Sequence, residues 1–406
     1  MLIPQVKYNL KDICICPAPI TTISTRTLCN IYNEDGNLPI FTAPMDTVVN
    51  LENLDIWHKY KIIPILPRTI DINTRLDYCL HKNEWIAVSL DEFEKYFTKK
   101  SDLSFDNVEK VKVLIDMANG HMCKIYERTK KAKEFLDFIF VKSEFMVGNV
   151  ANPQIFSAQS EKSYWYCDYA DYIRVGIGGG TCCTTTSQCG VHYPMASLIS
   201  EMYNAKGHQK IVADGGIKTY ADAIIALALG ADYVMIGTTF ASLFESASNI
   251  LFTDNKEPAY IYNCDSHDIL YDFYKRNITE ESNLLSFNKS NLKYDVSDKM
   301  IGLKKVILKR YKLSKIVYGM STPEAQLKIN SNTKVKVTEG LVRYVDCVKT
   351  IYDWTLEFSS YLKSTMSYTN SRTLDEFIGK PDCYVKSNQT INDINKPIDN
   401  VISYYY

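Results

Sequence analysis

The chain has 406 residues, of which 46% are hydrophobic and 23% are charged, and its formal net charge at pH 7 is −1. This balance excludes the strongly basic proteins that bind nucleic acid or an anionic membrane through overall charge, so neither partner is expected. Its twelve cysteines are too few for a disulfide scaffold, and the N-terminus has no basic segment before a long apolar run. We therefore expect a cytoplasmic protein with reduced thiols.

Short apolar, β-branched runs recur along the first 240 residues, with helical patterns between them. The eight runs are 38–43, 61–66, 85–90, 111–116, 145–149, 172–177, 210–214 and 233–237. They begin about 23 to 38 residues apart, which is the length of one strand–helix unit. The pattern predicts an α/β fold built as a closed (β/α)8 TIM barrel, with a doubly wound open sheet as the alternative.

Six of these runs lead into residues that are not typical of a core. The loops are Met45-Asp46-Thr47, DMANG at 116–120, Gly148-Asn149, the segment RVGIGGGTCCTTT at 174–186, Asp214-Gly215-Gly216 and Gly237-Thr238-Thr239. Any one loop could be an ordinary turn. In a barrel all six gather at the carboxyl-terminal rim, where active sites of this fold lie.

The remaining chain divides by composition. We expect the barrel and its active-site loops over 1–248. Residues 249–312, where Asn, Asp, Lys, Tyr and Ser dominate, are expected as an insertion that could form a small subdomain. A flap and the C-terminal part of the catalytic domain are expected over 313–383. The polar, Asn-rich residues 384–406 predict a loose tail.

The loop at 174–186 combines glycines, which permit close backbone approach, with threonine hydroxyls and two adjacent thiols. Together with TAPMDTV, VADGG, DYVMIG and YGMS, this loop resembles the IMP dehydrogenase and GMP reductase family. The likeness runs over the barrel and the C-terminal segment and skips the insertion. The barrel known for that family agrees with the fold predicted from the eight runs.

The resemblance implies a catalytic thiol. Cys183 takes the position of the nucleophile that attacks C2 of the purine, and Cys182 takes a variable position beside it. The covalent intermediate then exchanges hydride with a nicotinamide cofactor. Thr185 and Glu339 resemble a relay that protonates a departing amine.

The resemblance also implies the binding residues. Backbone N–H groups without an obstructing Cβ, as in Gly215-Gly216, suit a phosphate, and Asp214 resembles the residue that binds the ribose, although a helix cap is the alternative for it. The substrate set is Met45, Thr181, Asp214, Gly215, Gly216, Gly237, Thr238, Tyr318, Gly319, Met320, Lys336 and Gly340. The cofactor set, for NADPH or NAD(H), is Asp116, Met117, Ala118, Asn149, Ser364 and Ser367. A monovalent cation, usually potassium, is implied at Gly178, Gly180, Cys183 and Thr186, and a homotetramer is implied as the assembly.

Within the family, the residues favour GMP reductase, which converts GMP to IMP and ammonia with NADPH. The segment 318–339 contains no Arg, whereas a dehydrogenase places an Arg-Tyr pair there, and DMANG resembles the reductase sequence. Arg68 stands where His and Lys are typical after the second strand. The alternatives are an IMP dehydrogenase that makes XMP with NAD, a relative acting on a modified or deoxy purine nucleotide, and an inactive nucleotide-binding protein.

Overall fold

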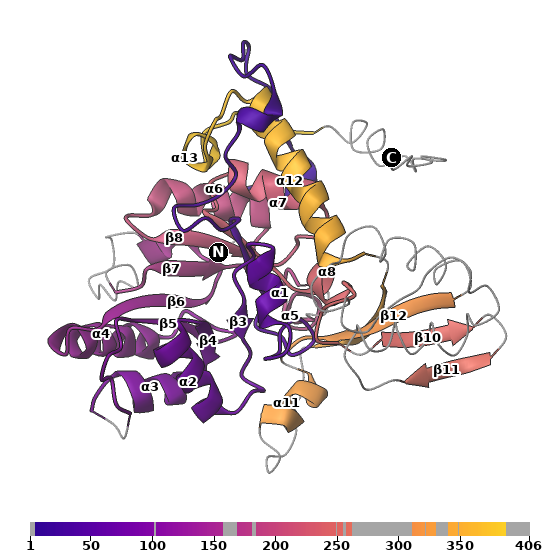
Figure 1. Ribbon diagram of the computed structural model, residues 1–406. Coiled ribbons are helices and arrows are strands. Elements are labelled where there is room, and N and C mark those ends of the chain that lie inside the picture. The colour runs from indigo at the N-terminus through magenta and orange to yellow at the C-terminus, as the bar shows by residue number, and fades with distance from the viewer. Residues whose placement is uncertain are drawn as a thin grey trace.

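The computed structural model describes residues 5–100, 103–156, 169–180, 184–248, 250–254, 257–261, 311–320, 322–329, 340–347 and 349–386. At its centre is a sheet of eight parallel strands in the order β2-β9-β8-β7-β6-β5-β4-β3 (Figure 1). The strands are β2 (Ile40–Thr42), β3 (Ile65–Leu66), β4 (Trp85–Val88), β5 (Lys110–Asp116), β6 (Lys142–Val150), β7 (Tyr172–Val175), β8 (Lys210–Asp214) and β9 (Tyr233–Ile236). Each overlaps one predicted run, so all eight predicted strands are confirmed.

The two end strands of this order, β2 and β3, are joined through Ile63. Its N–H donates to the Ile40 carbonyl (3.0 Å), and its carbonyl accepts from the Thr42 N–H (2.9 Å). The Thr42 hydroxyl oxygen also accepts from the Ile65 N–H (3.0 Å). The predicted TIM barrel is therefore confirmed, and the open-sheet alternative is wrong because an open sheet would leave these two strands as separate edges.

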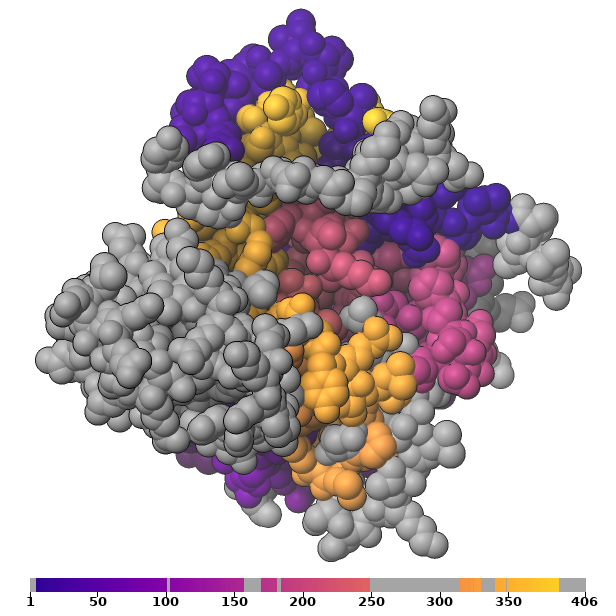
Figure 2. Space-filling view, turned by 90° about the vertical axis from the view of Figure 1, so that its right-hand side faces the viewer, coloured from indigo at the N-terminus to yellow at the C-terminus, as the bar shows by residue number. Residues whose placement is uncertain are grey.

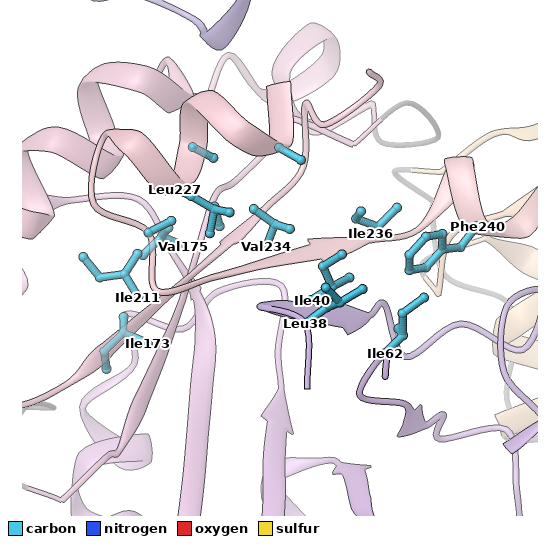
Figure 3. Packing of buried hydrophobic residues seen from close by; sticks show 14 of the residues in the cluster. Leu38, Ile40, Ile62, Ile173, Val175, Ile211, Leu227, Val234, Ile236 and Phe240 are labelled. Carbon is cyan, nitrogen blue, oxygen red and sulfur yellow. The ribbon is translucent and has the colours of Figure 1, made fainter. Parts of the chain in front are cut away.

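Helices surround the barrel in the expected alternation. They are α1 (Leu54–Lys59), α2 (Ile72–Lys82), α3 (Leu90–Phe97), α4 (Cys123–Phe138), α5 (Thr185–Cys189), α6 (Met195–Ala205), α7 (Tyr220–Ala228), α8 (Thr238–Ala241) and α12 (Ile351–Tyr368). Capping boxes at Ser89, Thr219 and Thr350 fix where α3, α7 and α12 begin. Figure 3 shows the apolar layer between sheet and helices, in which Ile211, Val234 and Ile236 project from the strands and Leu227 and Phe240 from the helices.

A second apolar cluster fills the inside of the barrel and forms the floor of the site above it. Phe41, Trp85, Tyr172 and Tyr233 are buried and meet mostly edge to face, with ring centroids 5.0 to 6.0 Å apart. Such contacts favour a rigid arrangement. Ala43 and Met235 belong to the same cluster and line the cavity at the carboxyl-terminal rim.

After the barrel, four antiparallel strands form a separate sheet in the order β11-β10-β12-β13. They are β10 (Ile250–Asp254), β11 (Glu257–Ile261), β12 (Tyr311–Tyr318) and β13 (Val342–Asp346). The segment expected as an insertion thus begins with two strands that join the sheet of the expected flap segment. Residues 262–310 lie outside the described part, and the boundaries predicted for this region stay predictions.

Lys315 anchors this sheet to the barrel. Its side chain is fully buried, and Nζ donates to the carbonyls of Phe244 (2.9 Å) and Ser246 (2.9 Å) and to the Ser246 hydroxyl (2.8 Å). Burial lowers the pKa of Lys315 to about 8. All three ammonium hydrogens are therefore paired, which is what a buried amine requires.

The first residues of the segment expected as a loose tail, 384–386, lie in or next to a strand. Cys383–Val385 forms β14, which pairs antiparallel with β1 (Ile13–Ile15), and the Lys386 N–H donates to the Asp12 carbonyl (2.8 Å). This pairing has a simple physical reason: without β14, the backbone N–H and C=O groups along the edge of β1 would have no partner. Residues 387–406 lie outside the described part.

The described part of the chain also contains short elements: η1 (Leu10–Asp12), η2 (Arg26–Leu28), η3 (Pro153–Phe156), α11 (Pro323–Ile329) and α13 (Leu374–Phe377). Among the described residues, no helix combines the length and the apolar character needed to cross a membrane. Figure 2 views the side on which the orange C-terminal segment lies next to the pink loops of the barrel.

Candidate active site

A cavity of about 460 Å³ opens at the carboxyl-terminal rim of the barrel. Loops after the parallel strands form most of its wall, and Gly319, Met320 and Gln326 of the C-terminal segment complete it. Fourteen predicted site residues line this cavity: Met45, Asp116, Ala118, Asn149, Gly178, Gly180, Thr185, Asp214, Gly215, Gly216, Gly237, Thr238, Gly319 and Met320. Residues more than 270 positions apart in sequence thus meet at one rim, as the barrel prediction required.

The other predicted residues fall into two groups, those outside the described residues and those that do not line the cavity. Thr181, Cys183, Lys336 and Glu339 fall outside the described residues. Met117, Thr186 and Tyr318 neighbour lining residues in sequence without lining the cavity themselves, and Gly340 does not line it either. Ser364 and Ser367 lie on α12, where the Ser367 hydroxyl donates to the Ser364 carbonyl (2.7 Å) and the Ser367 carbonyl accepts from the Thr21 hydroxyl (2.9 Å).

A buried guanidinium lies at the centre of the charged groups in the cavity. Arg174 on β7 is only 8% exposed. Its Nη1 donates to Asp116 Oδ1 (2.6 Å), and its Nε donates to Asp214 Oδ2 (3.0 Å). Burial alone would lower the pKa of Arg174, but the charges of Asp214 and Asp116 outweigh burial and raise it. The guanidinium therefore stays charged and fixes the two carboxylates, which belong to different loops.

Sequence reasoning missed Arg174 as a site residue. The sequence did contain a signal, because Arg174 is a cation inside an otherwise apolar strand, Tyr172–Val175. A buried charge without a partner is too costly to keep, so such a residue indicates an acidic partner nearby.

Asn149 extends this network. Its Nδ2 donates to Asp214 Oδ2 (2.7 Å) and to the Gly176 carbonyl (2.8 Å). The helix-cap alternative for Asp214 is wrong, because the N-cap of α7 is Thr219, whose side chain accepts from the Asp222 N–H. Asp214 instead presents its carboxylate to the cavity, held by donors from β7 and from the end of β6.

Two glycines let the loops after β7 and β8 approach one another. A Cβ on Gly176 would lie 2.0 Å from the Asp214 carbonyl oxygen, and Gly176 has φ +127°. Gly215 has φ +99°, and a Cβ there would lie 3.1 Å from the Gly179 carbonyl carbon. A larger residue at either position would push the two loops apart, so the loop separation depends on these glycines.

The residues on either side of the predicted nucleophile line the cavity. Gly180 precedes the segment 181–183 and Thr185 follows it at the start of α5, and both contribute to the wall. The Thr186 hydroxyl donates to the Gly178 carbonyl (2.9 Å), and His192 Nδ1 donates to the Ile177 carbonyl (3.0 Å). The loop is thus tied to α5 and to the connection before α6. The predicted cation-binding residues Gly178 and Thr186 are therefore bonded to each other.

Arg68, after β3, is a second cation of the cavity. Its Nη1 lies 3.4 Å from the Asp116 carbonyl oxygen, a long hydrogen bond. Its Nε is buried and has no hydrogen-bond partner among the residues that the structure describes. A guanidinium with an unused donor in a cavity wall suits an acceptor on a ligand.

His121 joins the loop after β5 to the loop after β6. Its Nε2 accepts from the Ala151 N–H (2.9 Å), which requires a neutral ring. Much of the side chain is exposed, yet desolvation by the surrounding loops lowers the pKa of His121. The folded chain therefore holds this imidazole neutral at neutral pH.

The hydrogen bond from the Ala151 N–H to the neutral His121 ring predicts that stability depends on pH. The unfolded chain binds a proton at His121 once the pH falls below about 6.5, whereas the folded chain resists protonation, so acidification destabilises the fold. Between about pH 7.5 and about pH 5.5 we expect the wild-type Tm to fall by about 2 °C more than that of His121→Gln, which keeps an acceptor without titrating. Parallel Tm curves from thermal denaturation would show that the bond does not contribute.

Comparisons with known proteins fit this geometry. A model of the IMP dehydrogenase / GMP reductase domain matches residues 80–269. The chain is 28% identical to GMP reductase 2 of Mus musculus over 281 residues, which cover 64% of this chain and 76% of the relative. It is 26% identical to GMP reductase 1 of Homo sapiens over 282 residues, 64% of this chain and 77% of the relative. The GMP reductase of Oceanobacillus iheyensis is 28% identical over 258 residues, 62% of this chain and 75% of the relative.

Proposed function

Because the chain belongs to the IMP dehydrogenase / GMP reductase family, we propose that it is a purine nucleotide oxidoreductase that reduces GMP to IMP and ammonia with NADPH. The observation that carries the proposal is the cavity itself. It joins the Asp116–Arg174–Asp214 network and the glycines of the loops after β7, β8 and β9 to the two flanks of the Cys183 segment.

The nucleotide would lie across the loops after β8 and β9. Backbone N–H groups of Gly215, Gly216 and Gly237 offer donors to its phosphate without obstructing side chains, and Lys218 lines the same part of the cavity. The hydrogen bonds from Asn149 and Arg174 end on Asp214 Oδ2, which leaves Oδ1 for the ribose hydroxyls. Thr181, Lys336 and Gly340 remain proposed contacts of the same nucleotide.

The chemistry proposed for the chain uses one thiol and one proton relay. The Cys183 thiolate forms a bond to C2, the C2–N bond breaks, and ammonia leaves with a proton that Thr185 relays from Glu339. A nicotinamide cofactor, when bound, supplies the hydride that C2 receives as the C2–S bond breaks and the thiolate is restored. Thr185 already lines the cavity beside the Cys183 segment.

Residues of the loops after β5 and β6 would hold that cofactor. Asp116, Ala118 and Asn149 line the cavity, Met117 adjoins them, and Arg68 adds a guanidinium for an anionic or carbonyl group. Ser364 and Ser367 lie on α12 and do not line this cavity, so within the proposal they reach a cofactor only across an interface between copies in a homotetramer. Potassium would be held by the carbonyls of Gly178, Gly180 and Cys183 beside the Thr186 hydroxyl, and would brace the catalytic loop.

Dehydrogenation of IMP is the second candidate, and the position of one residue pair argues against it. Arg343 and Tyr344 lie on β13, both are exposed, and Arg343 pairs in register with Val317. A water-activating pair should line the cavity, and these two residues do not. A covalent intermediate formed from IMP would therefore hydrolyse poorly to XMP.

One pair of incubations tests the direction of the reaction. Purified protein with GMP and NADPH should consume NADPH and release IMP and ammonia over many turnovers, whereas IMP with NAD should yield XMP slowly if at all. Chromatography separates the nucleotides, and NADH in place of NADPH measures the cofactor preference. Sustained XMP production together with no NADPH consumption in the presence of GMP would replace the reductase with the dehydrogenase, and tight GMP binding without product would favour a binding protein.

A further inference from the structure

The side chains of Asp46, Tyr318 and Lys328 form a hydrogen-bonded junction, and of the three only Tyr318 belongs to the predicted site residues. Lys328 Nζ donates to Asp46 Oδ2 (2.6 Å) and to the Tyr318 hydroxyl (2.7 Å), and that hydroxyl donates to Asp46 Oδ2 (2.8 Å). Lys328 Nζ also lies 5.4 Å from the centre of the Tyr318 ring. The junction joins three elements that are far apart in sequence: the loop after β2, the end of β12, and α11.

The charges of the junction are fixed over the working pH range. The Asp46 side chain is only 11% exposed, whereas the Lys328 side chain is 55% exposed, so water screens the ion pair from the lysine side. Burial raises the pKa of Tyr318 to about 12, with the Asp46 charge adding to the effect. Burial alone would lower the pKa of Lys328, but its hydrogen bonds to Asp46 and Tyr318 outweigh burial and raise it. Lysine therefore stays charged and tyrosine stays protonated.

Each member of the junction is one or two residues from a residue that lines the cavity. Met45 precedes Asp46, Gly319 follows Tyr318, and Gln326 lies on α11 two residues before Lys328. The junction thus ties together three pieces of the same wall. A shift of any one member would move the lining residue beside it.

The position of α11 depends on such tertiary contacts. The helix has seven residues, which is too short to be stable alone in water. Figure 1 shows it as a short orange helix apart from the helices that surround the barrel. Ala325 is buried, and the Thr322 hydroxyl donates to the Gly319 carbonyl (2.8 Å), so this end is held locally, whereas Lys328 holds the other end to the barrel.

We propose that Lys328 is a positioning residue for the purine nucleotide: through Asp46 and Tyr318 it holds α11 and the 319–320 segment at the distance from the barrel that the nucleotide requires. The inference rests on the proposed function, because it assumes that this cavity takes a purine nucleotide. It assigns Tyr318 a different task from the expected one, since its hydroxyl contacts the junction and not the cavity.

The test compares three variants of the full chain. Lys328→Met keeps the aliphatic stem and removes the charge, Lys328→Arg keeps the charge, and Lys131→Met is the matched control at an exposed lysine of α4. We expect the Kd for GMP to rise about tenfold in Lys328→Met, because two hydrogen bonds of a charged group are lost, and to stay within about threefold of wild type in Lys328→Arg and Lys131→Met. The same change should appear in KM for GMP, with kcat changing by less than about threefold.

A second readout needs no ligand. Hydrogen exchange of the 324–329 amides should speed up in Lys328→Met while exchange in α6 and α7 stays as in wild type. If wild type binds no GMP, the proposed function fails, and the exchange data alone decide on the junction. Unchanged exchange at 324–329 in Lys328→Met overturns the inference, and so does an unchanged Kd for GMP in a chain whose wild type binds it.

Discussion

Arg174→Met is expected to lower the free energy of unfolding by about 3–5 kcal/mol, because removing one partner of a buried ion pair leaves the other charge uncompensated. Here two carboxylates lose their shared cation. Asp116 and Asp214 both contact the guanidinium, at 2.6 Å and 3.0 Å. Without it the two negative charges repel one another at the centre of the site. Urea denaturation measures the loss through the midpoint of unfolding.

Matched variants separate charge from geometry. Arg174→Lys keeps the charge but cannot bond both carboxylates as a fork. Its free energy of unfolding should therefore lie between that of wild type and that of Arg174→Met. Arg26→Met makes the same change at an exposed residue and should shift stability by no more than about 0.5 kcal/mol. A loss below about 1 kcal/mol in Arg174→Met would mean that the network does not depend on its cation.

Cys183→Ala is expected to reduce kcat for GMP by about a thousandfold or more, because no other group of the proposed site can form the bond to C2. The Kd for GMP should change by less than about threefold, since the proposed phosphate and ribose contacts belong to the loops after β8 and β9. Steady-state NADPH oxidation gives kcat, and equilibrium dialysis of GMP gives the Kd.

The neighbouring thiol provides the control. Cys182→Ala should retain most activity, since only Cys183 takes the nucleophile position of the family motif. Intact-protein mass spectrometry after rapid quenching should detect a nucleotide adduct in wild type and in Cys182→Ala, and none in Cys183→Ala. The opposite result, an inactive Cys182→Ala and an active Cys183→Ala, would contradict the assignment of the nucleophile.

The strands and the rim loops could be predicted because their signals are local. Each strand is a short apolar run, as in Val111 to Asp116, and each loop begins where that run meets Gly, Asp or Asn. Parallel strands bring their carboxyl ends together whatever the rest of the chain does. For that reason Met45, Asp116 and Asp214, which lie far apart in sequence, could be placed at one rim before any contact was known, whereas Gly319 was placed there by the family resemblance.

The contacts within the site could not be predicted in this way. Arg174 looked like one residue of a buried strand, and nothing near it in sequence indicates that Asp116 and Asp214, 58 and 40 positions away, would pair with it. Lys315 likewise gave no sign in the sequence that it is fully buried against the carbonyls of Phe244 and Ser246. Both cations lie in strands, and their partners are set by how the strands and loops pack.

The sequence by itself thus determined the barrel, the rim on which the site lies and the family motif around Cys183, because periodicity and short motifs act over a few residues. Only the tertiary structure decided which charges meet: Arg174 with its two carboxylates, Lys328 with Asp46 at a separation of 282 residues, and the returning strand β14 with β1. Such pairings depend on the relative positions of whole elements, and one exposed edge or buried charge could be satisfied by many partners until packing selects one.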